Sequence, residues 1–248
     1  MGPVKETRRV AVVGSGGWLG QRLCRAFART GAKVLRVSHS EAADHTWDFA
    51  APDSLSRALD LASATQRIDC VVYVAAKTVN SPSSRRLSEA ARLSLAQHLS
   101  AAADLTAWLS DNPSISVAWI SSIGATAGKR GASSYSALKA FNEECAFLAA
   151  QSRLPDAFSV VFRLGLLNGG QAKSLPKRSQ QSVLARSLTQ VPVPAEEVAE
   201  NIARITGHPA NLNGQVIAID GGFEAIRNSG SSSYVFGTER AAQTSEAG

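Results

Sequence analysis

Two residues in the stretch "SSYSALKAF" (133–141) carry side chains that could move a proton together. Tyr135 and Lys139 are four positions apart, so on a helix they would lie one turn from each other on the same face. A tyrosine hydroxyl has an ordinary pKa near 10, and a neighbouring ammonium group favours the phenolate and lowers that pKa. The pair is therefore either a proton donor with a cation that tunes it, or one turn of an ordinary amphipathic helix.

A glycine cluster near the N-terminus provides a second candidate site. The segment "GSGGWLG" follows the apolar run at 9–14 and opens a helical pattern, with glycines at positions 14, 17 and 20. Glycine permits a tight turn and lets the backbone approach a pyrophosphate, and the helix N-terminus then offers free N–H groups to the phosphates. The pattern favours nucleotide binding, and a tight turn in another α/β fold is the alternative.

The end of the second apolar run (33–38) bears on the choice of cofactor. An acidic residue there would bind a ribose 2′-hydroxyl, but this chain has Ser38, His39 and Ser40, and its first acid is Glu41. With Arg36 nearby, these side chains would tolerate a 2′-phosphate. The sequence therefore favours NADP(H) over NAD(H).

Two residues of "TWDFA" (46–50) could belong to an adenine site. The Asp48 carboxylate could accept a hydrogen bond from the adenine amino group while Phe49 packs beside the ring. An Asx turn at the end of a strand explains Asp48 equally well. Both interpretations stay open at this stage.

Apolar runs that alternate with helical patterns must position these candidates. Strands are predicted at 9–14, 33–38, 46–50, 69–76, 116–122, 159–165 and 215–220, and helices at 18–30, 53–64, 88–110, 134–152 and 194–206. Short β-branched runs with helices between them indicate parallel strands and right-handed crossovers. We predict a single-domain α/β fold with a doubly wound, seven-stranded parallel sheet of Rossmann type. It spans 9–222, between an N-terminal tail (1–8) and a polar C-terminal tail (223–248).

Composition excludes several other classes of protein. The chain has 248 residues and 44% hydrophobic content, which suits one domain with a sizeable core. A net charge of +6 is compatible with nucleic acid or an anionic small molecule, but the chain has no arginine-rich arm and no helix-turn-helix pattern, so we expect no nucleic-acid partner. No apolar run reaches the roughly 20 residues of a membrane span, and the start lacks a secretory signal. Three cysteines without a CxxC pair suit a reducing cytoplasm, and we expect no metal site.

Four landmarks in order give the chain a family resemblance from residue 9 to about residue 222. They are the glycine loop, "DCVVYVAA" (69–76), the serines before "YSALK", and "LNGQVIAIDGG" (212–222). The chain resembles the short-chain dehydrogenase/reductase family, in which a serine precedes the tyrosine by about 13 positions. Here that serine is Ser122, at the end of the strand predicted at 116–122. The resemblance implies an NAD(P)H-dependent oxidoreductase, similar to a ketoreductase, that interconverts a ketone and an alcohol.

The resemblance also assigns roles to residues. Hydride arriving at a carbonyl carbon leaves charge on the oxygen, so Ser122 would orient that oxygen and Tyr135 would supply the proton. Lys139 would tune Tyr135 and bind the nicotinamide ribose. The catalytic residues are thus Ser122, Tyr135 and Lys139. The cofactor-binding residues expected are Gly14, Ser15, Gly17, Trp18, Leu19, Gly20, Ser38, His39, Ser40, Asp48, Phe49, Ala75, Ala76, Tyr135, Lys139, Leu164, Gly165 and Leu167.

Departures from the family pattern keep two other functions open. Tyr73 to Ala76 stand where the family has Asn-Asn-Ala-Gly, and Ser94 falls where the family has a helix asparagine that serves a water-linked proton relay. The glycine loop is closer to the extended branch of the family, whereas the chain length matches the short branch. The alternatives are an epimerase or dehydratase that uses a bound dinucleotide, and a non-catalytic protein that senses dinucleotides.

The segment after the sixth strand, 166–192, would cover the substrate. It carries four cations and no acid, the cations being Lys173, Lys177, Arg178 and Arg186. Such a lid could recruit an anionic or carrier-bound carbonyl or alcohol substrate, and a solvated mobile loop is the alternative. Gly169-Gly170 would suit a hinge. The resemblance further implies a homodimer or homotetramer through the helices at 88–110 and 134–152.

Overall fold

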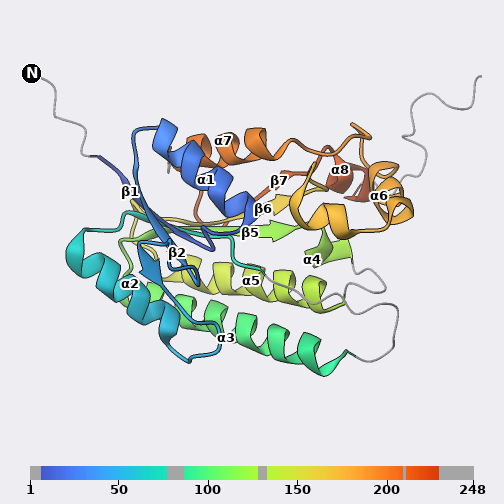
Figure 1. The fold of residues 1–248 in the computed structure, drawn as a ribbon. Coiled ribbons are helices and arrows are strands. Elements are labelled where there is room, and N and C mark those ends of the chain that lie inside the picture. The colour runs from blue at the N-terminus through green and yellow to red at the C-terminus, as the bar shows by residue number, and fades with distance from the viewer. Residues whose placement is uncertain (1–6, 77–86, 128–132, 209–210, 229–248) are drawn as a thin grey trace, which may run out of the picture.

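A parallel sheet between two layers of helices forms the body of the protein (Figure 1). The computed structural model describes residues 7–76, 87–127, 133–208 and 211–228. The strands are β1 (Arg9–Val13), β2 (Lys33–Ser38), β3 (His45–Thr46), β4 (Cys70–Tyr73), β5 (Ser116–Ser122), β6 (Ser159–Leu164) and β7 (Val216–Ile219). They lie in the order β3-β2-β1-β4-β5-β6-β7, and all neighbours are parallel. The predicted seven-stranded, doubly wound sheet is confirmed.

Five long helices cover the two faces of the sheet. α1 (Trp18–Arg29) and α7 (Ala195–Thr206) lie on one face, and α2 (Ser54–Thr65), α3 (Glu89–Asp111) and α5 (Ser133–Gln151) lie on the other (Figure 1). Four short helices follow strands β5 to β7: α4 (Gly124–Ala127), the 3-10 helix η1 (Gly170–Ser174), α6 (Lys177–Leu184) and α8 (Phe223–Asn228). None of the helices in these ranges is long and apolar enough to cross a membrane.

The apolar runs form strands because the sheet buries both of its faces. Successive strand side chains point to opposite faces, so Val10 and Val12 of β1 enter the core under α1 and α7, whereas Ala11 and Val13 enter the core on the other face. The strand order changes direction between β1 and β4. In doubly wound sheets, ligands bind beside the carboxyl ends of the strands at such a switch point.

The C-terminal tail begins later than the sequence predicts. Residues from 223 were expected to be a polar tail, but Phe223–Asn228 form α8. The Asp220 carboxylate accepts hydrogen bonds from the N–H groups of Gly222 (2.8 Å) and Glu224 (2.9 Å), which starts the helix. Phe223 is buried in a small cluster with Ile123. Residues 229–248 and 1–6 of the predicted tails lie outside the described residues.

The predicted lid, 166–192, is built from η1 and α6 and is attached at its base. Leu167 forms a parallel bridge with Val193, and the Gln171 side chain donates to the Ala76 carbonyl at 2.9 Å. A Cβ atom at Gly169 would lie 2.3 Å from the Trp18 indole, so glycine is needed where the lid meets the glycine loop. The segment is therefore partly helical and is bonded to the rest of the fold at its base, and its role as a lid stays a prediction.

Candidate functional site

A cavity of about 360 Å³ lies at the carboxyl ends of the strands. The glycine loop, the end of β5, the first turns of α5 and the lid line it. Among the described residues that line it there is no aspartate or glutamate, and Lys139 is the only lysine or arginine. Among the described residues, the charged side chain that the cavity presents is thus a cation, which suits a ligand with negative charge.

The three predicted catalytic residues line this cavity together. Ser122 ends β5, and Tyr135 and Lys139 lie on α5. The Ser122 hydroxyl accepts a hydrogen bond from the Gly124 N–H at 3.1 Å. A Cβ atom at Gly124 would lie 3.4 Å from the Tyr135 ring and 3.5 Å from the Ser122 hydroxyl, so a residue without a side chain lies beside both. The spacing that suggested the group is thus matched by its geometry, and the catalytic roles themselves stay predictions.

Burial changes the pKa values of Tyr135 and Lys139. It raises the pKa of Tyr135, and a hydrogen bond with Ser122 opposes that rise. Burial lowers the pKa of Lys139 to about 8, and the nearby Glu143 carboxylate opposes that fall. The Lys139 ammonium lies 5.8 Å from the centre of the Tyr135 ring and donates to the Ile120 carbonyl at 2.7 Å. Burial therefore dominates the ionisation of both side chains in this arrangement, and the lowering of the Tyr135 pKa by Lys139 stays a prediction.

The glycine loop has the geometry of a phosphate site. Gly14 has a φ of +92°, and a Cβ atom there would lie 2.8 Å from the Ala75 backbone, so only glycine fits between β1 and β4. α1 begins after Gly17 with no side-chain capping bond and no acid in its first turn. Its first N–H groups are free to meet an anion. The loop therefore fits the pyrophosphate of a dinucleotide.

Two of the three residues predicted to contact the ribose line the cavity. Ser38 and His39 line the cavity, whereas Ser40 does not, and the Ser40 N–H donates to the Ser38 hydroxyl at 3.2 Å. The Arg36 guanidinium is bound by the Asp44 carboxylate at 2.9 Å, which lowers the pKa of Asp44. Arg36 is thus already paired on the surface, and the serines with His39 remain the candidates for contact with the ribose.

Asp48 forms the Asx turn that was the alternative to an adenine contact. Its carboxylate accepts a hydrogen bond from the Ala50 N–H at 2.8 Å, which is an Asx turn, and Asp48 does not line the cavity. Phe49 does line it, with its ring centroid 3.9 Å from that of Trp47. The structure thus shows the Asx turn at Asp48, and the adenine contacts of Asp48 and Phe49 stay predictions.

Of the other residues predicted to bind the cofactor, one does not line the cavity and ten do. Ser15 is buried and does not line the cavity. Those that do line it are Gly14, Gly17, Trp18, Leu19, Gly20, Ala75, Ala76, Leu164, Gly165 and Leu167. Sequence reasoning missed Trp47, Gly124, Ser136 and Gln171, which also line it. The first three lie within two positions of a predicted site residue, whereas nothing in the sequence indicated that Gln171 reaches β4.

The comparison with known families settles the relationship of this chain. The model of the NAD dependent epimerase/dehydratase family matches residues 10–169, which is more than half of the chain. The chain belongs to the NAD dependent epimerase/dehydratase family. No curated protein matches its sequence.

Solved structures show that this family member has the short-chain dehydrogenase/reductase fold. A gluconate 5-dehydrogenase from Burkholderia cenocepacia J2315, in complex with NADP and tartrate, is 17% identical with a TM-score of 0.74, and the match covers 88% of this chain and 95% of that one. A blue fluorescent protein from a metagenomic library, in complex with NADPH, is 19% identical with a TM-score of 0.74 and coverage of 88% and 98%. A short chain dehydrogenase/reductase family protein is 18% identical with a TM-score of 0.71 and coverage of 88% and 97%.

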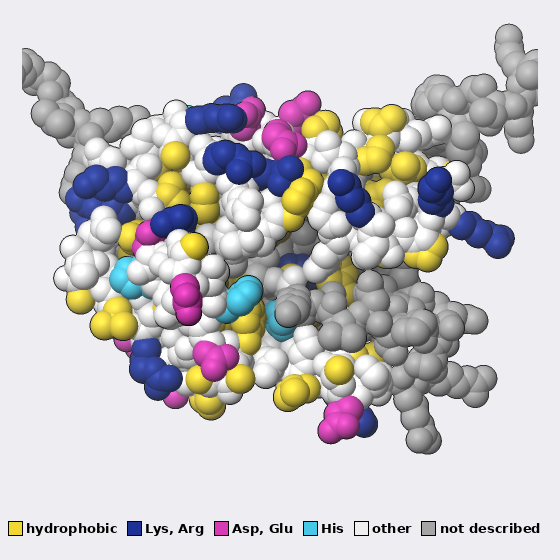
Figure 2. All heavy atoms as spheres, viewed as in Figure 1, with side chains coloured by type: hydrophobic (Ala, Val, Ile, Leu, Met, Phe, Trp, Pro, Cys, Tyr) yellow, Lys and Arg dark blue, Asp and Glu magenta, His cyan; other side chains and the backbone are white. Residues whose placement is uncertain are grey.

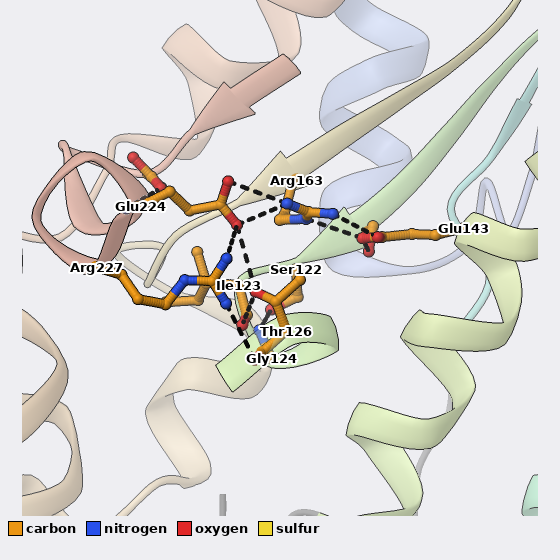
Figure 3. A network of polar contacts seen from close by, with 10 residues as sticks. Ser122, Ile123, Gly124, Thr126, Glu143, Arg163, Glu224 and Arg227 are labelled. Atoms are coloured by element: carbon orange, nitrogen blue, oxygen red, sulfur yellow. Dashed lines mark hydrogen bonds and ion pairs between the residues drawn. The ribbon is translucent and has the colours of Figure 1, made fainter. Parts of the chain in front are cut away.

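Behind the cavity, this epimerase/dehydratase family member has a buried cluster of charges (Figure 3). We call it the Arg163 cluster, and it comprises Ser121, Glu143, Arg163 and Glu224. The Ser121 hydroxyl donates to Glu143 at 2.5 Å, and Arg163 binds Glu143 at 2.6 Å and Glu224 at 2.8 Å. These contacts tie β5, α5, β6 and α8 together directly beneath Ser122.

The position that corresponds to the family's helix asparagine lies away from the described residues that line the cavity. Ser94 lies on α3 and does not line the cavity, and its carbonyl lies 2.7 Å from His98 Nδ1.

Proposed function

We propose that the protein is an NADP(H)-dependent oxidoreductase, similar to a ketoreductase, that interconverts a carbonyl group and an alcohol. The observation that carries this proposal is that Ser122, Tyr135 and Lys139 line the same cavity as the glycine loop at the start of α1. Membership of a family named for NAD dependence supports it. So do the NADP and NADPH bound in the gluconate 5-dehydrogenase and the blue fluorescent protein.

The side chains supply the proton and the orientation. A bound nicotinamide supplies hydride to the carbonyl carbon. As negative charge develops on the carbonyl oxygen, the Ser122 hydroxyl donates a hydrogen bond to it and Tyr135 gives it a proton. The Lys139 ammonium, when charged, favours the Tyr135 phenolate and so eases the loss of that proton. In the direction of oxidation, Tyr135 accepts the proton from the alcohol.

The preference for NADP(H) follows from the missing carboxylate. Ser38 and His39 are the polar side chains at the end of β2 that line the cavity, so nothing there repels a 2′-phosphate. Titration of NADPH and NADH fluorescence should give tighter binding of NADPH. Ser38→Asp should reverse that order, because a carboxylate binds the 2′-hydroxyl of NADH and repels the phosphate of NADPH. Tighter binding of NADH by wild type would contradict the cofactor proposal.

The lid supports an anionic or carrier-bound substrate. Its four cations, Lys173, Lys177, Arg178 and Arg186, are exposed. In Figure 2, Lys and Arg side chains stand over the region of α6 without Asp or Glu beside them, whereas those over α1 and α7 have acids next to them. Such a surface attracts negative charge. Carboxylated or phosphorylated ketones should therefore have a lower KM than neutral ketones of the same size.

A ketone screen tests the proposed function. The protein is mixed with NADPH and a panel of neutral and anionic ketones, and the loss of nicotinamide absorbance is followed. Tyr135→Phe should lower kcat/KM by about 10² to 10⁴, the range for a lost general acid, while it leaves NADPH binding intact. If wild type binds NADPH and reduces nothing, a dinucleotide sensor replaces the reductase.

The family name favours one other activity. An epimerase or dehydratase uses its dinucleotide without net consumption, so substrate would change with no lasting loss of nicotinamide absorbance. Chromatography of nucleotide sugars and hydroxy acids after incubation with NADP-loaded protein distinguishes this activity from reduction. The reductase proposal is preferred because the described chain after residue 169 forms only the short lid (η1 and α6) and the elements α7, β7 and α8, without a separate substrate domain among the described residues.

We also propose a cytoplasmic homodimer or homotetramer without nucleic-acid or membrane partners. Leu93 on α3 and Leu148 on α5 are 59% and 57% exposed, on the two helices expected to meet a second copy. Cys24, Cys70 and Cys145 are free thiols, which suits a reducing compartment. Light scattering that gives the mass of a monomer would contradict the oligomer.

A further inference from the structure

Apolar side chains form the part of the cavity wall that follows Ser122. Ile123 is the next residue of the chain, and Leu166 and Val183 come from the predicted lid, so segments that are distant in sequence meet here. Ile123 and Val183 are buried in one cluster with Phe223, and Leu166 packs against that cluster. The wall that begins beside the proposed hydrogen-bond donor is therefore packed and apolar.

The described wall of the cavity thus has a polar part and an apolar part, which different elements supply. The hydroxyl and ammonium groups of the polar part belong to the end of β5 and to α5, and they include Ser122, Tyr135 and Lys139. A carbonyl oxygen that faces Ser122 and Tyr135 uses this polar part. The carbon chain attached to that carbonyl then has the apolar part to pack against.

The predicted lid presents apolar residues to the cavity and cations to the solvent. Within this segment, which the structure describes throughout, Gln171 is the only residue with a polar side chain that lines the cavity. Val183 is the residue of α6 that lines the wall, whereas Lys177 and Arg178 of the same helix are exposed and do not line it. An anionic group of the substrate would therefore meet these cations outside the wall, while the carbon chain meets the apolar inner surface.

Three polar side chains of the lid donate their hydrogen bonds to backbone carbonyls. The Gln171 amide donates to the Ala76 carbonyl at 2.9 Å. The hydroxyls of Ser174 and Ser187 donate to the carbonyls of Gln171 and Leu184, at 2.7 and 2.9 Å. A substrate hydroxyl that is buried against this wall would lose its hydrogen bonds to water, and a loss without replacement weakens binding. The wall therefore discriminates against hydroxylated carbon chains.

We propose that the carbonyl substrate carries an alkyl or aryl chain that packs against Ile123, Leu166 and Val183, and that polyhydroxylated carbonyl compounds are poor substrates. Burial of the chain against this wall favours binding through the hydrophobic effect. A carboxylate or carrier on the substrate stays on the outer side, near the cations of the lid. The inference rests on the proposed function for the carbonyl, and it adds the chemistry of the chain attached to that carbonyl.

A matched pair of ketones tests this substrate class. 5-Oxohexanoate and 5-oxogluconate share their chain length, carbonyl position and carboxylate, and they differ only in the hydroxyl groups of 5-oxogluconate. With NADPH and the full chain, kcat/KM should be at least about tenfold higher for 5-oxohexanoate, because 5-oxogluconate must bury hydroxyls without partners. In a series from 2-butanone to 2-octanone, kcat/KM should rise by about fourfold per methylene until the cavity is filled.

One substitution in the wall connects this preference to a named side chain. Val183→Thr keeps the shape of the side chain and replaces a methyl group by a hydroxyl, so kcat/KM for 2-octanone should fall by about threefold to tenfold, whereas that for 5-oxogluconate should not fall. The matched control is Val191→Thr, in the same segment but 58% exposed and outside the cavity wall, which should leave both values unchanged. If Val183→Thr does not fold, Leu175→Asn should give the same change, because Leu175 is partly buried and also lines the cavity.

A binding measurement separates this inference from the proposed function. Calorimetry of 2-octanone with wild type, with and without NADP⁺, should give a negative heat-capacity change, as burial of apolar surface does, and Val183→Thr should weaken the binding. Such binding without reduction of any ketone would refute the proposed function and leave the apolar site standing. Equal or faster reduction of 5-oxogluconate would overturn the apolar substrate class and leave the reductase standing. An unchanged preference in both Val183→Thr and Leu175→Asn would show that this wall does not contact the substrate, and it would overturn the inference.

Discussion

Helix α5 contributes residues to two buried polar regions, which differ in how completely their polar groups are paired. One is the Arg163 cluster of Ser121, Glu143, Arg163 and Glu224. The other, which we call the Tyr135 region, comprises Tyr135, Ser136, Lys139 and Asn142. In the cluster each charge meets an opposite charge, whereas in the Tyr135 region the Ser136 hydroxyl and the Asn142 amide have no partner within the described chain. Glu143 and Asn142 are adjacent in sequence and yet belong to different regions.

The difference separates residues that hold the fold from residues prepared for chemistry. A buried charge that is fully hydrogen-bonded fixes the elements that supply its partners. The Arg163 cluster does this for the end of β5, where Ser122 lies (Figure 3). Unpaired polar groups weaken a fold, and here they lie beside the cavity and behind Lys139. Stability and proposed function thus come from neighbouring turns of one helix.

The largest effect should come from removal of the arginine at the centre of the cluster. Arg163→Leu removes the cation that binds the Glu143 and Glu224 carboxylates directly, at 2.6 and 2.8 Å, and leaves Glu224 with Arg227 at 3.9 Å. Loss of one partner of a buried pair typically costs about 3 to 5 kcal/mol. Urea unfolding at neutral pH should show this loss in the free energy of unfolding.

A surface pair provides the control for that measurement. Arg29 and Glu200 are 2.8 Å apart, with side chains 67% and 52% exposed. Arg29→Leu should cost less than about 1 kcal/mol, as exposed pairs do. Equal losses for the two variants would mean that the Arg163 cluster contributes no more than a surface pair.

The second prediction concerns the charge in the Tyr135 region. The folded-state pKa of Lys139 is about 8, below its ordinary 10.5, so the folded protein releases this proton at a lower pH than the unfolded chain does. Between those two values the unfolded chain holds more protons, and stability rises with pH. Relative to Lys139→Met, wild type should therefore gain about 2 kcal/mol in the free energy of unfolding between pH 7 and pH 9.5. Urea titrations of both proteins at the two pH values measure this gain, and a constant difference would show that the ammonium is not desolvated.

Local patterns predicted the sheet and most of the cavity wall. Continuous apolar runs at 9–14 and 116–122 could only be strands buried on both faces, and the glycine loop predicted a phosphate site from one short segment. Ser122 needed the family spacing, because a serine at the end of a strand is common. Its position beside Tyr135 is then a consequence of the β5–α5 connection.

Contacts between distant residues were not readable from the sequence. The segment after 222 was predicted to be a tail because it is rich in serine and glycine. The sequence could not show that Phe223 packs with Ile123 and that Glu224 binds Arg163, because both partners lie far away in the chain. The Asp48 carboxylate accepts a hydrogen bond from the Ala50 N–H, which is only two residues along the chain. The helical spacing placed Lys139 near Tyr135, but it could not show that the Ile120 carbonyl would hold the ammonium.

The smallest predicted effect distinguishes the two regions with one type of substitution. Ser121 and Ser136 are both buried and both line the cavity. The Ser121 hydroxyl donates to the Glu143 carboxylate at 2.5 Å, whereas the Ser136 hydroxyl has no hydrogen-bond partner among the described residues. Ser121→Ala should cost about 2 kcal/mol, because a hydrogen bond to a charged group is lost. Ser136→Ala should change the free energy of unfolding by less than about 1 kcal/mol, with a gain as the expected direction, because the hydroxyl that it removes has no hydrogen-bond partner in the part of the chain that the structure describes. Urea unfolding of the two variants side by side measures the contrast. If Ser136→Ala costs as much as Ser121→Ala, a water satisfies that hydroxyl, and the Tyr135 region is then hydrogen-bonded as completely as the Arg163 cluster.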